Sequence, residues 1–155
     1  MGISKRVLFV CTGNYYRSRY AELLFNRMAA ERGLAWLADS RGTDVVNGGR
    51  WNVGPLSPFA RQGLRERGVD AGDAPRLPAQ LREADLAEAD LVIGICEAEH
   101  RPHLRRGFPV WEDRVEYWAV EDLGTTPPDE ALAELHRHVE ELVERLVHED
   151  VPPAC

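Results

Sequence analysis

The feature that most constrains this chain is a cysteine that ends an apolar run and precedes an arginine by six residues. Residues 7–10 are all apolar, Cys11 follows them, residues 12–16 include a glycine and an asparagine, and a helical pattern begins at Arg17. A strand that turns into a helix in this way directs backbone N–H groups toward one spot, which suits an anion. The same positive field favours the thiolate form of a cysteine. We therefore expect a nucleophile and an oxyanion cradle in one loop.

The rest of the chain alternates between strand-like and helix-like segments. We expect strands over 7–11, 34–39, 90–96 and either 108–111 or 115–120, helices over 17–32, 57–68, 81–89, 98–105 and from 126 onward, and a glycine-rich loop over 40–53. Such alternation predicts an α/β fold built on a parallel sheet. Ligands of these sheets bind at the carboxyl ends of the strands, where Cys11 and Cys96 are both expected.

Length, charge and cysteine content narrow the class of protein. The 155 residues suit one domain, which we place at 1–150, and residues 151–155 are expected to form a loose tail. A net charge of −7 argues against nucleic acid or an anionic membrane as a partner. The three cysteines are too scattered for a disulfide framework or a zinc site. No segment has the pattern of a membrane span or a signal peptide, so we expect a cytoplasmic location, and the oligomeric state stays open.

The segment from Val10 to Glu22 reads V-C-T-G-N-Y-Y-R-S-R-Y-A-E and closely resembles the active-site loop of low-molecular-weight protein tyrosine phosphatases. It also resembles the loop of the related thioredoxin-coupled arsenate reductases. The resemblance implies a single-domain, three-layer α/β fold with a four-stranded parallel sheet in the order 2-1-3-4, flanked by helices. It also implies a phosphate-binding loop after the first strand, comprising Thr12, Gly13, Asn14, Tyr15, Tyr16, Arg17 and Ser18.

The resemblance implies three catalytic roles. Cys11 would attack the phosphoryl group and form a phosphocysteine, Arg17 would bind phosphoryl oxygens, and Asp122 would act as general acid and then as general base. Neither a cofactor nor a metal is expected, because Arg17 and the loop amides supply the positive charge. The predicted substrate is a phosphotyrosine protein or a small aryl phosphate, and phosphate-like oxyanions are expected to inhibit.

Other residues match supporting positions of the family. Asn14, a residue type that tolerates left-handed backbone, is expected to hold the loop in its tight conformation. Ser18 would steady the thiolate, and Ser40 would join the same hydrogen-bond network. Trp51 and Tyr15 are candidates for the walls of the substrate slot, since an aromatic side chain there could stack on a phenyl ring.

The sequence also departs from the family pattern. Leu123 replaces the proline that follows the family's acidic residue, and Glu121 is the nearest competing acid. Asp129 is better explained as part of a capping box with Thr126. Tyr16 stands where many relatives carry a second loop cysteine.

Two parts of the family's site have no match. The tyrosine pair that forms the second wall of the slot in eukaryotic relatives is absent, so Tyr15 or Trp118 would have to replace it. A histidine of the family's support network finds no counterpart around 71–74. None of the histidines of this chain is assigned a catalytic role.

Two other functions stay open beside the phosphatase that we favour. Cys96 aligns with a redox cysteine of the arsenate reductases, but Arg101 and Pro102 stand where the next cysteine of their relay lies. A reductase built on this chain would therefore need an external thiol. The missing Asp-Pro pair and aromatic wall also fit a non-catalytic phosphate-binding relative.

Overall fold

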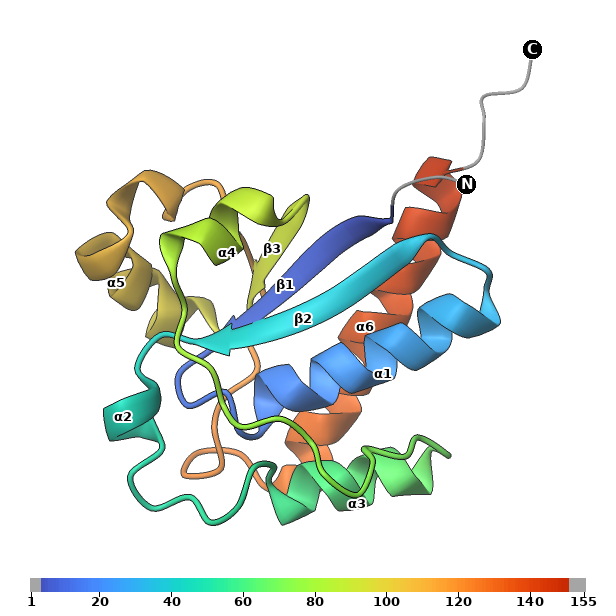
Figure 1. Cartoon of the computed structure of the whole chain (residues 1–155), viewed down its shortest axis with the longest axis horizontal. Coiled ribbons are helices and arrows are strands. Elements are labelled where there is room, and N and C mark those ends of the chain that lie inside the picture. The colour runs from blue at the N-terminus through green and yellow to red at the C-terminus, as the bar shows by residue number, and fades with distance from the viewer. Residues whose placement is uncertain (1–3, 151–155) are drawn as a thin grey trace.

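The computed structural model describes residues 4–150, which form a sheet covered by helices on both faces (Figure 1). Residues 1–3 and the expected tail at 151–155 lie outside the described part of the chain. Within residues 4–150, no helix combines the length and the apolar character that crossing a bilayer would require.

The sheet has the predicted strand order. Its strands are β1 (Lys5–Cys11), β2 (Trp36–Gly42), β3 (Leu91–Gly94) and β4 (Glu116–Tyr117). They lie in the order β2-β1-β3-β4, and every neighbouring pair is parallel. The carboxyl ends of β1, β2 and β3 therefore meet at one edge of the sheet, which is where the site was expected.

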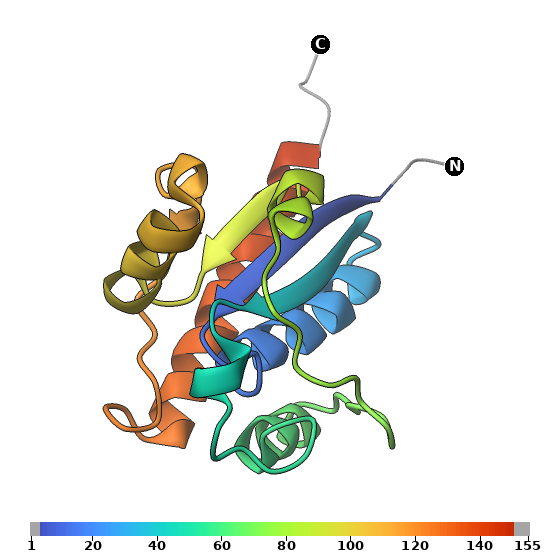
Figure 2. The ribbon, with the colours of Figure 1, turned by 60° about the vertical axis from the view of Figure 1, so that its left-hand side comes forward.

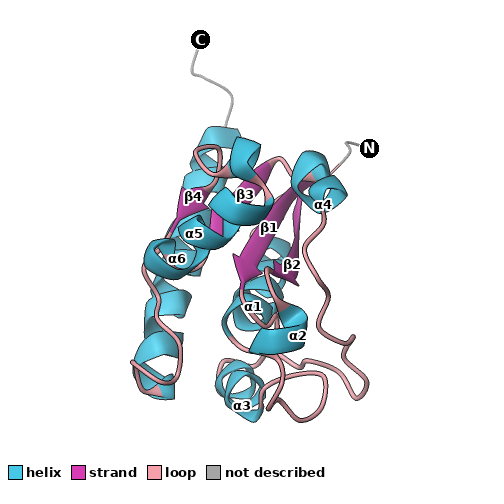
Figure 3. Cartoon of the chain, turned by 90° about the vertical axis from the view of Figure 1, so that its left-hand side faces the viewer, coloured by secondary structure: helices cyan, strands magenta, loops and turns pink. Residues whose placement is uncertain are grey.

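Helices cover the two faces of the sheet unequally. They are α1 (Arg17–Glu31), α2 (Val45–Gly48), α3 (Pro58–Glu66), α4 (Glu83–Glu88), α5 (Glu97–Gly107) and α6 (Pro128–Asp150), with a 3₁₀ turn, η1, at Pro109–Trp111. Helices α1, α3 and α6 pack in the larger core, and α4 and α5 pack in a smaller core on the opposite face (Figure 2). The short helix α2 lies beyond the carboxyl ends of β1 and β2 (Figure 3).

The central strand β1 shows why the sequence before Cys11 is continuously apolar. Val7, Phe9 and Cys11 belong to the core shared with α1 and α6, whereas Leu8 and Val10 belong to the core shared with α4 and α5. Side chains of a strand alternate between faces, and here both faces are covered, so no polar residue interrupts the run. This arrangement fixes the thiol of Cys11 on the α1 side of the sheet.

On three local points the structure decides or corrects the expectation. The first is the choice between two candidates for the fourth strand: residues 108–111 contain the turn η1 instead, because Pro109 has a fixed φ and no N–H and begins that turn. The fourth strand lies within the other candidate range and has two residues. The second was an entirely irregular segment over 40–53, where Asp44 caps the short helix α2 by accepting a hydrogen bond from the N–H of Asn47.

The third concerns the start of the last helix. The expected capping box of Thr126 and Asp129 is not formed, because α6 begins at Pro128 and the Thr126 hydroxyl bonds to Glu121 instead, at 3.4 Å. The Glu121 carboxylate is thereby hydrogen-bonded within the loop that precedes α6.

Candidate active site

Cys11 ends β1 at the base of the loop that leads into α1. The residue is 2% exposed, and its Sγ lies 2.8 Å from the hydroxyl oxygen of Ser18. The backbone N–H groups of residues 13–18 donate to no acceptor within residues 4–150. Tyr16, the N-cap residue of α1, makes no side-chain cap either. Free N–H groups at a helix start form a site for an anion, so a bound oxyanion would lie next to the thiol.

Asn14 holds this loop in shape. It is fully buried and has a φ of 51°, in the left-handed region that asparagine tolerates better than most residues. Its Nδ2 donates to the hydroxyls of Ser18 and Ser40, each at 2.9 Å. The structure thus brings together the three supporting residues that the sequence indicated.

Arg76 completes that network and was missed by the sequence analysis. Its Nη1 donates to Oδ1 of Asn14 at 2.9 Å, and its Nη2 donates to the Ser40 hydroxyl and to Glu22 Oε1, each at 3.0 Å. Burial raises the pKa of Glu22, while the Ser40 hydroxyl at 2.6 Å and Arg76 act in the opposite direction. Arg76 thus takes part in the support network for which the sequence analysis found no histidine around 71–74.

Arg17 is buried and uses only part of its donor set within the protein. Its Nη1 donates to Glu99 Oε1 at 3.1 Å and to the carbonyl of Val120 at 2.9 Å, and its Nη2 donates to Glu99 Oε2 at 2.7 Å. These bonds leave the Nε–H and one Nη2–H without an acceptor among residues 4–150. Those two donors lie side by side on one edge of the planar group, the arrangement that binds two phosphoryl oxygens at once.

Glu99 and His100 orient the guanidinium, and the sequence analysis missed both. His100 is fully buried, and its Nδ1 accepts from the N–H of Cys96 at 3.0 Å, so its Nε2 carries the proton that faces Glu99 at 3.0 Å. The Thr12 hydroxyl also donates to Glu99. Burial lowers the pKa of His100. Although burial raises the pKa of Glu99, the hydrogen bonds from His100 and Arg17 outweigh it and hold that pKa well below its usual range.

Of the two acids in the loop before α6, Asp122 lies at the pocket. Its Oδ2 is 3.7 Å from Nη2 of Arg17, and its Oδ1 accepts from the N–H of Leu123 at 2.9 Å. Its carbonyl accepts from the N–H groups of Thr125 and Thr126, both at 3.0 Å, so a hydrogen-bonded turn shapes this loop without the family's proline. The side chain of Asp122 is 58% exposed and has room to move.

The mouth of the pocket is formed by few side chains. Its lining comprises Cys11, Gly13, Tyr15, Tyr16, Arg17, Gly48, Asn52, Asp122 and Leu123. The Tyr15 hydroxyl donates to the carbonyl of Val53, which fixes that ring beside the mouth. Trp51 is 87% exposed and does not contribute to the lining, whereas Trp118 is buried between Phe9 and His138.

Cys96 lies on the other side of the sheet from Cys11. Ile95 belongs to the same core as Cys11, and Cys96 is the next residue, with extended backbone at φ −142° and ψ 111°. Alternation along extended backbone therefore directs its side chain to the opposite face. Both thiols are free and buried.

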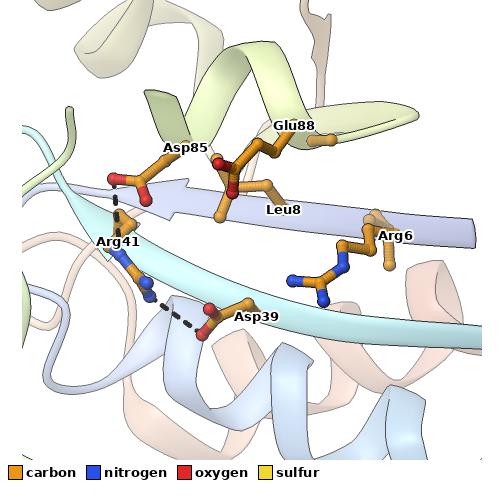
Figure 4. Close-up of a pocket in the computed structure, with 8 residues that line it drawn as sticks. Arg6, Leu8, Asp39, Arg41, Asp85 and Glu88 are labelled. Carbon is orange, nitrogen blue, oxygen red and sulfur yellow. Dashed lines mark ion pairs between the residues drawn. The ribbon is translucent and has the colours of Figure 1, made fainter. Parts of the chain in front are cut away.

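A second pocket of the sheet carries charges but no nucleophile. Arg41 pairs with Asp39 at 2.9 Å and with Asp85 at 3.4 Å, below α4 (Figure 4). Glu88 and Arg6 complete its polar lining. Because these carboxylates already have a cation between them and no thiol lies nearby, this pocket has no comparable chemistry.

Comparisons with known proteins agree with this geometry. A family model described as low molecular weight phosphotyrosine protein phosphatase matches residues 6–149. The pig protein named low molecular weight phosphotyrosine protein phosphatase is 31% identical over 133 residues, covering 84% of this chain and 77% of its own. A Streptomyces coelicolor low molecular weight protein-tyrosine-phosphatase is 36% identical over 111 residues, 70% of this chain and 62% of its own. The crystal structure of a low molecular weight protein tyrosine phosphatase from T. tengcongensis superposes with a TM-score of 0.76 at 33% identity, over 92% of this chain and 99% of the other.

Proposed function

Because the chain belongs to the low molecular weight phosphotyrosine protein phosphatase family, we propose that it hydrolyses phosphotyrosine in proteins, or a small aryl phosphate, through a phosphocysteine. One observation carries the proposal. The Cys11 thiol lies at the base of a loop whose N–H groups have no acceptor among residues 4–150. Beside it lies Arg17, which has two donors without an acceptor in the same range and whose Nη2 is 3.7 Å from the Asp122 carboxylate.

In the first step, the Cys11 thiolate attacks phosphorus and an S–P bond forms. The bond between phosphorus and the leaving oxygen breaks, and Asp122 gives its proton to that oxygen. The free donors of Arg17 and the loop amides bind the other phosphoryl oxygens, where charge develops in the transition state. The hydroxyl of Ser18, 2.8 Å from the sulfur, stabilises the thiolate before attack and as it leaves again.

In the second step, water attacks the phosphocysteine. Asp122, now a carboxylate, takes a proton from that water, the S–P bond breaks, and the thiolate and inorganic phosphate are released. Because phosphate is the product and fits the same loop, phosphate and similar oxyanions would inhibit competitively.

The remaining site residues have supporting roles in this proposal. Asn14, Ser18 and Ser40 keep the loop in the shape that exposes its amides. Tyr15 forms one wall of the slot, and Trp51 is available to close over a bound aryl group from its exposed position. We place the reaction in the cytoplasm, where thiols stay reduced, because the mechanism needs Cys11 as a free thiol.

The test is hydrolysis of a phosphotyrosine peptide beside phosphoserine and phosphoarginine peptides of the same sequence. Wild type should release phosphate fastest from phosphotyrosine. Cys11→Ser should show no turnover and still bind phosphate, because a serine hydroxyl without a base is a poor nucleophile while the donors are unchanged. Turnover by Cys11→Ser would refute covalent catalysis. Arsenate-dependent thiol consumption, measured in parallel, would reveal a reductase instead.

A further inference from the structure

Tyr16 places an unpaired hydroxyl inside the active-site region. The residue is 5% exposed, and its hydroxyl oxygen is buried without a hydrogen-bond partner among residues 4–150. Nearly all buried polar groups in proteins are paired, so such a group calls for an explanation. A phenylalanine would fill the same space in the core without leaving a polar atom unpaired.

The surroundings of this hydroxyl point to the general acid. Tyr16 and Asp122 both line the same pocket, and Arg17, the neighbour of Tyr16, lies 3.7 Å from the Asp122 carboxylate. Burial raises the pKa of Tyr16 to about 12, with the charge of Asp122 the next contribution in that direction. The phenol is therefore a hydrogen-bond donor at any working pH.

Asp122 is not yet in a catalytic position in the described structure. Its Oδ1 accepts from the adjacent N–H of Leu123, and its Oδ2 rests near Arg17, whose remaining donors are needed for phosphate. When substrate takes those donors, the carboxyl group must turn toward the leaving oxygen. One of its oxygens then needs a new partner while the other transfers the proton.

We propose that Tyr16 is the positioning residue of the general acid: its hydroxyl donates to the non-transferring oxygen of Asp122 when the other oxygen faces the leaving group. This inference rests on the proposed phosphatase mechanism. The hydrogen bond stabilises the carboxylate that forms as the proton leaves, and it keeps that carboxylate aimed for the attack of water.

The experiment compares Tyr16→Phe with wild type on aryl phosphates whose leaving groups span a wide pKa range. For phenyl phosphate, kcat/KM, which reports only the steps up to formation of the phosphocysteine, should fall about tenfold, the order expected when one transition-state hydrogen bond is lost. For a dinitrophenyl phosphate, whose leaving group needs no proton, the change should be under about twofold. In an Asp122→Asn background, Tyr16→Phe should cause no further loss, because the two residues act as one unit.

Tyr20, one turn into the helix that Tyr16 caps, provides a matched control. It is fully buried, its hydroxyl has no hydrogen-bond partner within the described residues, and it does not line the pocket. Tyr20→Phe removes the same atom from the same kind of environment and should leave both rates unchanged.

Each other outcome overturns the proposal. Equal losses for all leaving groups, or losses that add to those of Asp122→Asn, would mean that Tyr16 acts on the loop rather than on the acid. Unchanged kinetics would mean that the hydroxyl has no role. A large loss of thermal stability in Tyr16→Phe but not in Tyr20→Phe would mean that the hydroxyl is already paired. If wild type hydrolyses none of the esters, the proposed function fails instead, independently of Tyr16.

Discussion

Replacing Glu99 by glutamine tests how the buried arginine of the site is held. The side chain of Arg17 is 3% exposed and that of Glu99 is 29% exposed, and two hydrogen bonds of 2.7 and 3.1 Å join them. Removing one partner of a fully buried pair costs about 3–5 kcal/mol. The cost should be smaller here for three reasons: glutamine keeps one acceptor oxygen, Glu99 is partly solvated, and the Asp122 carboxylate remains 3.7 Å from Arg17. We therefore expect Glu99→Gln to lower the free energy of unfolding by about 1–3 kcal/mol.

The assay is thermal unfolding with and without saturating phosphate. For a chain of this length the expected loss corresponds to a Tm lower by roughly 2–12 °C. Bound phosphate restores a negative charge beside Arg17, so the difference in Tm between variant and wild type should narrow when phosphate is present. Glu97→Gln is the control, because Glu97 pairs with Arg101 on the exposed side of the same helix at 2.9 Å, and surface pairs contribute little.

The same variant makes a prediction about pH. Since the pKa of Glu99 is held below its ordinary value of 4.5, the unfolded chain binds more protons than the folded one as the solution is acidified. The stability difference between wild type and Glu99→Gln should be fully present above pH 4.5 and should shrink as the pH falls below it. A difference that is constant with pH, or that phosphate does not narrow, would refute the assigned role of Glu99.

Three further outcomes follow from the site. Asp122→Asn should lower kcat/KM on aryl phosphates by roughly 10²–10⁴-fold, less for leaving groups of low pKa, while Glu121→Gln should have little effect; the reverse pattern would identify Glu121 as the acid. Arg76→Ala removes one of the two donors to the Asn14 oxygen, the N–H of Ala79 being the other, and should weaken competitive inhibition by phosphate about tenfold; unchanged inhibition would show that the loop holds its shape without Arg76. Peroxide should inactivate the enzyme at Cys11, more slowly with phosphate bound, without a Cys11–Cys96 disulfide; mass spectrometry that finds this disulfide would contradict the opposite-face placement of the two thiols.

The parts of the fold that sequence could predict are those written in neighbouring residues. The run at 7–10, Cys11 and the start of α1 specify a strand, a loop and a helix in continuous order, so the nucleophile and its cradle could be placed without a structure. The parallel sheet followed from the alternation of strands and helices, whereas the order of its strands came from the resemblance. The fourth strand was ambiguous because two residues carry too little periodicity to choose between two apolar segments.

The parts that could not be predicted depend on how distant segments cross. Glu99 and His100 follow β3 on a helix where charged residues usually face solvent, and only the turn of α5 over the loop brings them to Arg17 and Thr12. Arg76 lies in a segment without regular structure, whose path past Asn14 has no local signal. Nothing in the sequence around Arg76 distinguishes it from the many other arginines of the chain.

The long reach of these contacts has a consequence for folding. Three hydrogen bonds of the loop join residues 65, 82 and 103 positions apart: Ala79 to Asn14, Arg17 to Glu99 and Arg17 to Val120. Contacts of such separation form late, because a large part of the chain must be ordered before they can close. A refolding molecule with β1 and α1 in place therefore has the sequence of an anion site but not its rigidity. Phosphate binding should appear together with the last cooperative step, which makes a bound oxyanion a selective marker of completed molecules in a folding mixture.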